Sequence, residues 1–129
     1  MSMFYRSTRD DNVKVTASQA ILKGLAADGG LFVPESIPSL DKSLEELSKM
    51  NYNEVAYEVM KLMLDDFTEE ELKSCIDRAY DSKFDTEEMT PLVKVENEYF
   101  LELFHGATIA FKDMAGMEQD RTISKKSPL

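Results

Sequence analysis

The chain has 129 residues, 43% of them hydrophobic and 31% charged, a composition typical of one globular domain with a modest core. Its net charge of −10 argues against a nucleic-acid or an anionic membrane partner, and its lone cysteine, Cys75, excludes an intrachain disulfide. One histidine and one cysteine leave no conventional transition-metal site. Without a membrane-spanning run or a signal-peptide pattern, we expect a cytoplasmic protein.

The first part of the chain predicts a strand, a helix and a second strand. Residues 4–9 (FYRSTR) alternate well enough to form a short strand. Thr16 and Gln19 have the spacing of a capping box, which begins a helix. Small and apolar residues then recur at helical spacing and mark a buried face: Ala17, Ala20, Ile21, Gly24 and Leu25. We expect Asp28-Gly29-Gly30 to end this helix, and residues 31–34 (LFVP) to form a short buried strand.

Residues 39–64 predict two further helices. In the first, over residues 39–50, helical spacing places three leucines on one side: Leu40, Leu44 and Leu47. The second, over residues 53–64, is apolar enough to be the central helix of the core. Its expected inward side chains are Val55, Val59, Leu62 and Met63.

A second capping box, Thr68 with Glu71, predicts a helix that continues to about Tyr80. The inward face of this helix has small and apolar residues at helical spacing: Leu72, Cys75, Ile76 and Ala79. Cys75 is therefore expected to be a small core residue, with a reactive thiol as the alternative.

The pattern changes to period two after Pro91. Residues 92–95 (LVKV) and 99–104 (YFLELF) flank Glu96-Asn97-Glu98, which predicts a hairpin with a three-residue connection. The expected fold class is therefore α+β. A helical N-terminal domain with a small β-sheet covers residues 1–90, and the hairpin lies within residues 91–115. Residues 116–129 are polar without amphipathic spacing, and we expect them to be a divergent, disordered tail.

Lys112 is the candidate for chemistry, although most lysines are surface cations. Ile109, Ala110 and Phe111 precede it, and an apolar setting would favour the neutral amine that attacks carbonyl groups, as in Schiff-base formation. Both interpretations of Lys112 stay open from the residues alone. His105, followed by glycine, is typical of a turn whose imidazole makes one structural hydrogen bond. Thr108 is a turn residue or a hydroxyl contact to a ligand.

Three segments together resemble the N-terminal portion of the threonine synthases, pyridoxal-phosphate enzymes related to the tryptophan synthase β subunit. They are YRSTR (5–9), ILKGLAADGGLFVPE (21–35) and ELFHGATIAFKDMA (102–115). The resemblance implies that Lys112 forms the Schiff base with pyridoxal phosphate and that His105 and Thr108 line or support the site. One departure is Ala107, where the family usually has proline; losing it frees a backbone dihedral without removing a reactive group.

The same resemblance implies an activity, a substrate and a domain arrangement. The family converts O-phosphohomoserine and water into threonine and phosphate, a lyase reaction of threonine biosynthesis, and residues 91–115 would open its α/β cofactor domain. The family's phosphate-binding loops lie further along a longer chain, so we expect this N-terminal fragment alone to be inactive and to bind the cofactor weakly or not at all. Residues 91–115 should then expose apolar surface and either be flexible or self-associate through an unpaired strand edge. Two alternatives are a non-catalytic interaction module that reuses this domain and a fragment of another pyridoxal-phosphate lyase.

Overall fold

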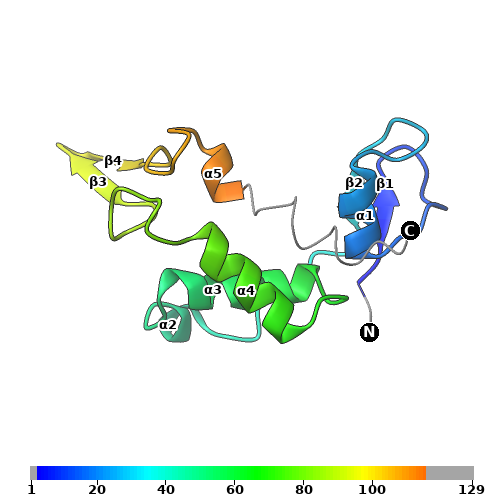
Figure 1. The fold of residues 1–129 in the computed structure, drawn as a ribbon, viewed down its shortest axis with the longest axis horizontal. Coiled ribbons are helices and arrows are strands. Elements are labelled where there is room, and N and C mark those ends of the chain that lie inside the picture. The colour runs from blue at the N-terminus through cyan, green and yellow to red at the C-terminus, as the bar shows by residue number, and fades with distance from the viewer. Residues whose placement is uncertain (1–2, 116–129) are drawn as a thin grey trace.

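The structure, a computed structural model, describes residues 3–115, and the tail expected at 116–129 lies outside the described residues. Its elements, in chain order, are β1 (Tyr5–Ser7), α1 (Ala17–Lys23), β2 (Phe32–Pro34), α2 (Leu44–Leu47), α3 (Tyr52–Met63), α4 (Glu69–Ala79), β3 (Leu92–Val95), β4 (Glu98–Leu101) and α5 (Lys112–Ala115). Figure 1 places β1, β2 and α1 at one end of the molecule, the α3–α4 pair in the middle and the β3–β4 hairpin at the other end. The α+β prediction is confirmed.

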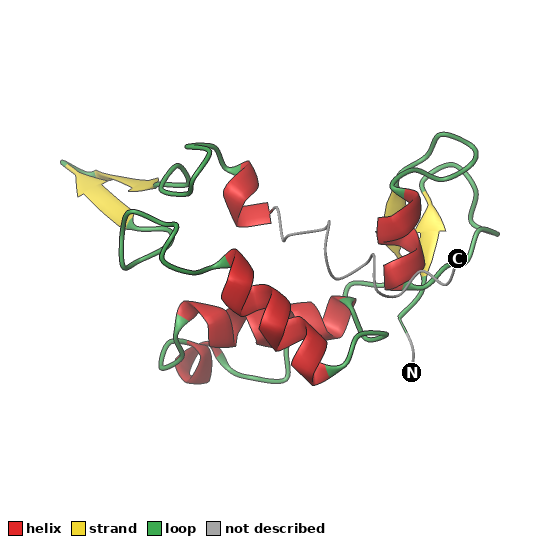
Figure 2. Ribbon diagram, viewed as in Figure 1, coloured by secondary structure: helices red, strands yellow, loops and turns green. Residues whose placement is uncertain are grey.

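The N-terminal unit is a small antiparallel sheet with α1 beside it (Figure 2). Strand β1 pairs with β2 so that Arg6 lies opposite Val33, and Tyr5 also bridges to Val15. The predicted capping box begins α1: the Thr16 hydroxyl accepts from the Gln19 amide, and the Gln19 side chain accepts from the Thr16 amide. Because both orphan amide groups are satisfied by the side chains themselves, the start of this helix is fixed locally.

The end of α1 differs from the prediction. The helix stops at Lys23, and Gly24 follows with φ of 69°, a left-handed conformation that glycine adopts without strain. The expected inward positions Gly24 and Leu25 are consequently exposed, and Ala26 is buried instead. Gly29, which was expected to end the helix, instead forms a turn of its own with φ of 78°.

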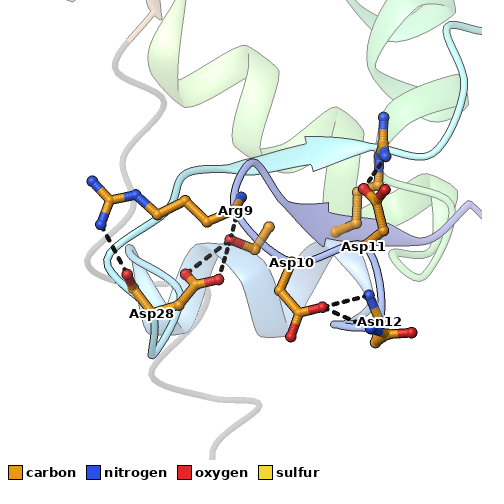
Figure 3. A network of polar contacts seen from close by, with 7 residues as sticks. Arg9, Asp10, Asp11, Asn12 and Asp28 are labelled. Carbon is orange, nitrogen blue, oxygen red and sulfur yellow. Dashed lines mark hydrogen bonds and ion pairs between the residues drawn. The ribbon is translucent and has the colours of Figure 1, made fainter.

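This second turn is tied to β1 by polar contacts (Figure 3). The buried Ser7 hydroxyl lies 2.9 and 2.8 Å from the two carboxylate oxygens of Asp28, and the Asp28 Oδ1 atom also accepts from the Gly30 amide at 2.8 Å. Arg9 adds a bond from its guanidinium to the Asp28 carbonyl at 3.0 Å. A Cβ atom at Gly30 would lie 2.1 Å from the Ser7 hydroxyl, so only glycine fits there.

Helices α3 and α4 pack together, and α4 supplies the buried side of the contact. All four inward residues predicted on α4, Cys75 among them, are buried. The predicted helix forms as α3, but its predicted burial is wrong: none of its residues is fully buried, Val59 is 44% exposed, and Val55, Leu62 and Met63 are half-buried. The α3 residues that pack against the core cluster are Ala56, Tyr57 and Met60, so the packed face is turned away from the one that the apolar pattern indicated.

The α2 region also departs from the prediction. Only Leu44–Leu47 is helical, and the leucine stripe does not form, because Leu40 is exposed and Leu44 is 84% exposed. Ser43 and Glu46 form a capping box that starts this single turn. A helix this short gains little from propagation and depends on its cap.

The predicted hairpin is confirmed with a shorter connection. Val95 pairs with Glu98, so the turn has two residues, Glu96 and Asn97, rather than three. Glu96 has φ of 54°, and a positive φ at the first turn position matches the twist of antiparallel strands. Every residue of both strands is exposed in this structure, apolar ones included. The hairpin therefore exposes apolar surface.

Candidate active site

Lys112 begins the short helix α5, and its side chain is exposed. The apolar residues before it do not bury it, since Ile109 is 75% and Phe111 is 64% exposed. Within residues 3–115, no hydrogen bond or ion pair involves the Lys112 amine. The Lys112 amine therefore lies in open rather than apolar surroundings.

Asp113, the next residue, holds the turn that precedes α5. The Thr108 amide donates to Asp113 Oδ2 at 2.8 Å, and the Thr108 hydroxyl donates to Asp113 Oδ1 at 2.7 Å. These hydrogen bonds, the hydroxyl bond foremost, lower the pKa of the Asp113 carboxyl. Sequence reasoning named Thr108 and missed Asp113. A threonine placed five residues before an aspartate, in a glycine-containing turn, is the signal that could have found it.

Gly106 closes the same turn from the other side. A Cβ atom built on Gly106 would lie 2.4 Å from the Asp113 Cβ and 2.5 Å from its Oδ2, so the close approach requires glycine. The Ile109 amide donates to the Gly106 carbonyl at 3.0 Å, and Ile109 has φ of 58°. A β-branched residue rarely adopts this conformation, which indicates that the surrounding contacts impose it.

His105 has two polar contacts where one was predicted. Its Nδ1 atom lies 2.6 Å from Asp85 Oδ1 and its Nε2 atom 2.6 Å from Glu102 Oε2, while the imidazole is only 12% exposed. Hydrogen bonds to Glu102 and then to Asp85 raise the pKa of His105. The Asp85 amide also donates to the His105 carbonyl at 3.0 Å. His105 thus joins the segment after α4 to the end of the hairpin.

Helix α5 is anchored to the helical core through Met114. The Tyr80 hydroxyl donates to the Met114 carbonyl at 2.7 Å, and the Met114 side chain packs against the cluster that contains Tyr80 and Phe84. Burial raises the pKa of Tyr80 to about 12, so the phenol remains a hydrogen-bond donor at neutral pH. The backbone beside Lys112 is therefore fixed to α4 although Lys112 itself faces solvent.

The structure brings together some of the predicted site residues and separates others. Thr108 contacts the residue next to Lys112, whereas His105 is engaged with Asp85 and Glu102; no hydrogen bond within residues 3–115 joins His105 to Lys112. An open groove of about 650 Å³ between α3 and α4 and a hollow of about 370 Å³ beside α1 are lined by other residues, not by Lys112. In the part of the chain that the structure describes, no cluster of metal-binding side chains forms and no helix could cross a membrane.

Comparisons with known proteins agree on one family. The family model described as "Threonine synthase N terminus" matches residues 4–80. The threonine synthase of Saccharomyces cerevisiae is 42% identical over 124 residues, which cover 88% of this chain and 24% of that protein. The threonine synthase of Schizosaccharomyces pombe is 44% identical over 115 residues, covering 86% of this chain and 22% of that protein.

Solved structures give the same result. The crystal structure of threonine synthase from yeast matches with a TM-score of 0.78 and 39% identity, covering 87% of this chain and 24% of that one. The structure of pyridoxal-phosphate-bound threonine synthase from Brucella melitensis matches with a TM-score of 0.81 and 34% identity, covering 97% of this chain and 28% of that one. The chain thus spans about a quarter of the length of the curated relatives it matches.

Proposed function

This chain belongs to the threonine synthase family and corresponds to its N-terminal part. We propose that it is the N-terminal part of a pyridoxal-phosphate-dependent threonine synthase. The proposed reaction is the lyase step of threonine biosynthesis in the cytoplasm, in which O-phosphohomoserine and water give threonine and phosphate. Lys112 is the proposed attachment point for the cofactor, and residues 91–115 are proposed as the first segment of the cofactor domain, after an N-terminal domain over residues 1–90.

The observation that carries this proposal is the match to threonine synthases, which covers 88% of this chain in the Saccharomyces cerevisiae relative. The setting of Lys112 is compatible with it: its amine has no hydrogen bond or ion pair within residues 3–115, while Thr108 is held by Asp113 and Met114 by Tyr80. A primary amine on a rigid backbone is the chemical group that condenses with an aldehyde such as that of pyridoxal phosphate. The residues present therefore fit the aldehyde end of the cofactor.

Each residue of the site has a role that its contacts support. Pyridoxal phosphate, when bound, supplies an electron sink for carbanion charge. The Lys112 amine, once free of the cofactor, can accept and return a proton as general base and acid. Thr108 and His105 support the site through the turn and the hairpin and do not reach the Lys112 amine by a hydrogen bond.

The chain offers less to the cofactor phosphate and to the substrate. Among the described residues, the glycines are Gly24, Gly29, Gly30 and Gly106, and none of these four lies in a Gly-rich phosphate-binding loop that leads into a helix. We therefore propose that the chain by itself is inactive towards O-phosphohomoserine and binds the cofactor weakly. The match over residues 4–80 to the threonine synthase family, rather than to another lyase, disfavours the alternative of a different pyridoxal-phosphate enzyme.

Borohydride trapping tests the assignment of Lys112. The chain is mixed with pyridoxal phosphate and reduced, and peptide mass spectrometry then measures the modified fraction of each lysine. Lys49 is the reference for an ordinary surface lysine, because its side chain is 69% exposed and makes only an exposed i,i+4 ion pair with Glu45 at 3.0 Å. We expect Lys112 to be modified preferentially over Lys49. In the K112R variant, we expect no lysine to be modified to a greater fraction than Lys49.

Two results would oppose the proposal. Equal modification of Lys112 and Lys49 would mean that the site has no preference for the cofactor, and would favour the non-catalytic interaction module. Preferential labelling of another lysine would place the attachment point elsewhere. In either case the family membership stands, because it rests on residues 4–80 and not on Lys112.

A further inference from the structure

We propose that Asp113 is the positioning residue for Lys112, fixing the backbone from which the Lys112 amine is presented. This inference rests on the proposed function of Lys112. It assigns to Asp113 a task separate from chemistry: its carboxylate does not contact the Lys112 amine, and it acts through the turn that it holds together.

The first support is that both carboxylate oxygens of Asp113 accept hydrogen bonds from a single residue, Thr108. Oδ2 accepts the Thr108 amide and Oδ1 accepts the Thr108 hydroxyl, at 2.8 and 2.7 Å. A two-point contact fixes the orientation of the carboxylate as well as its distance, and hydrogen bonds to an ionised acceptor are stronger than neutral ones. The turn before α5 is therefore tied to the first turn of that helix.

The second support is steric and independent of the first. Gly106 is buried, and its missing Cβ leaves the space that the Asp113 side chain occupies; an added Cβ would lie 2.4 Å from the Asp113 Cβ. Gly106 has no positive φ, so its role is to allow this approach and not to allow an unusual backbone conformation. The turn and Asp113 thus fit each other on two sides.

The third support is what lies on the other side of Asp113. Met114 is held by Tyr80 through its carbonyl and packs on the helical core. Positions 113 and 114 are consequently both anchored, while the neighbouring Lys112 is exposed and unpaired within residues 3–115. An anchored backbone with a free side chain is the arrangement that a positioned reactive amine requires.

The first measurement requires no cofactor and uses the full chain. The Thr108 amide is followed by nuclear magnetic resonance in the wild type and in D113A, D113N, T108V and G106A. We expect it to be protected from exchange in the wild type and to shift as Asp113 titrates, with a pKa below the usual value for aspartate. D113A and G106A should lose the protection. D113N should keep it, because the amide oxygen can accept from the Thr108 amide and its NH₂ can donate to the hydroxyl.

The second measurement is the borohydride trapping of Lys112 relative to Lys49. Displacing a reacting group by about 1 Å costs up to roughly 100-fold, so we expect D113A and G106A to lose about tenfold or more of the Lys112 preference. D113N should restore most of it. T108V, which keeps the backbone bond and loses the hydroxyl bond, should lie between. D10A is the matched control, because Asp10 accepts the Asn12 amide in a turn after β1, which Figure 1 places at the end of the molecule away from α5.

The outcomes separate the inference from the function on which it rests. If D113A loses the Thr108 protection and leaves the Lys112 preference unchanged, the positioning role is wrong and the function of Lys112 stands. If the wild type shows no Lys112 preference, the proposed function of Lys112 fails, and the positioning role that rests on it fails with it. Protection of the Thr108 amide in that case would show that the turn is formed and that the fault lies in the proposed function. If D113A unfolds, D113N and T108V decide: an unchanged preference in T108V together with a lost preference in D113N would overturn the inference.

Discussion

Both ring nitrogens of His105 face carboxylate oxygens, and this geometry selects one protonation state. A neutral imidazole has a single N–H, so one of its nitrogens would place a lone pair against Asp85 or Glu102 at 2.6 Å. The imidazolium donates to both. Since Asp85 follows α4 and Glu102 follows β4, the protonated ring holds two segments together that lie 17 residues apart in sequence.

We predict that this contact weakens as the pH rises. The pKa of His105 is raised in the folded chain, chiefly by the hydrogen bond to Glu102. Its stabilisation is therefore fully present below the unfolded pKa of about 6.5 and is lost as the pH rises through the higher folded pKa. Histidine resonances should titrate above 6.5, and the midpoint of thermal unfolding should fall on this upward pH change in the wild type and less in H105Q.

Two variants test the cause of that pKa. E102Q should lower the pKa of His105 more than D85N does, because the Glu102 bond is the larger contribution. Glu102 is also the less exposed partner, with 26% of its side chain accessible against 73% for Asp85. A His105 pKa at or below 6.5 in the wild type, or an equal effect of both variants, would contradict this account.

At the residue scale, the sequence left the environment of Lys112 open, and the structure shows an exposed side chain. The apolar residues Ile109 and Phe111 made a buried Lys112 one of two open interpretations, but both are exposed, and the positive φ of Ile109 belongs to a turn. Asp113 was missed because its hydrogen bond with Thr108 depends on the geometry of the turn between them, which sequence spacing alone does not specify. The roles of His105, Thr108 and Lys112 at the site stay predictions.

At the element scale, helix starts were the most predictable feature. All four helices from α1 to α4 begin with a capping box, and the sequence analysis identified those at Thr16 and Thr68. A capping box is a contact over three residues and needs no tertiary partner. The face that a helix buries does depend on its tertiary partners. The apolar pattern predicted this face correctly for α4 but not for α3.

Removing a cap should therefore have different consequences in α4 and α2. T68A should destabilise the chain by about 1 kcal/mol, because the Thr68 hydroxyl accepts the Glu71 amide at the start of the helix that supplies the core. S43A removes the same kind of cap from α2, which buries no residue, and should cost less than about 0.5 kcal/mol. Urea unfolding measures both. Equal losses would mean that α2 contributes to the cooperative unit.

The ends of helices were less predictable than their starts. Gly24 and Gly29 both adopt a positive φ, so the sequence offers two equivalent stops for α1, five residues apart. The structure uses the first, and the bonds of Asp28 to Ser7 and Gly30 hold the second as a separate turn. Because Ser7 lies 21 residues before Asp28, this choice depends on tertiary contacts that the local pattern does not contain.

At the scale of the whole molecule, the hairpin extends away from the helical core (Figure 1). It exposes apolar side chains on both of its faces. Leu92 and Leu101 pair on one face, and Val93 and Phe100 pair on the other, each from 37% to 60% exposed. A two-stranded sheet also leaves the outer edge of each strand unpaired within the described residues. Apolar faces next to open strand edges favour association between chains.

We predict reversible self-association through this hairpin, strengthened by salt because the net charge of −10 opposes it at low ionic strength. Burial of a phenylalanine contributes about 1.5–3 kcal/mol, so F100K should weaken association by about tenfold or more. L44K is the matched control: it makes the same charge change at a residue that is 84% exposed on α2, away from the hairpin. Sedimentation velocity over a concentration series measures the effect, and a monomeric wild type at all concentrations, or an equal effect of L44K, would refute the hairpin as the contact surface.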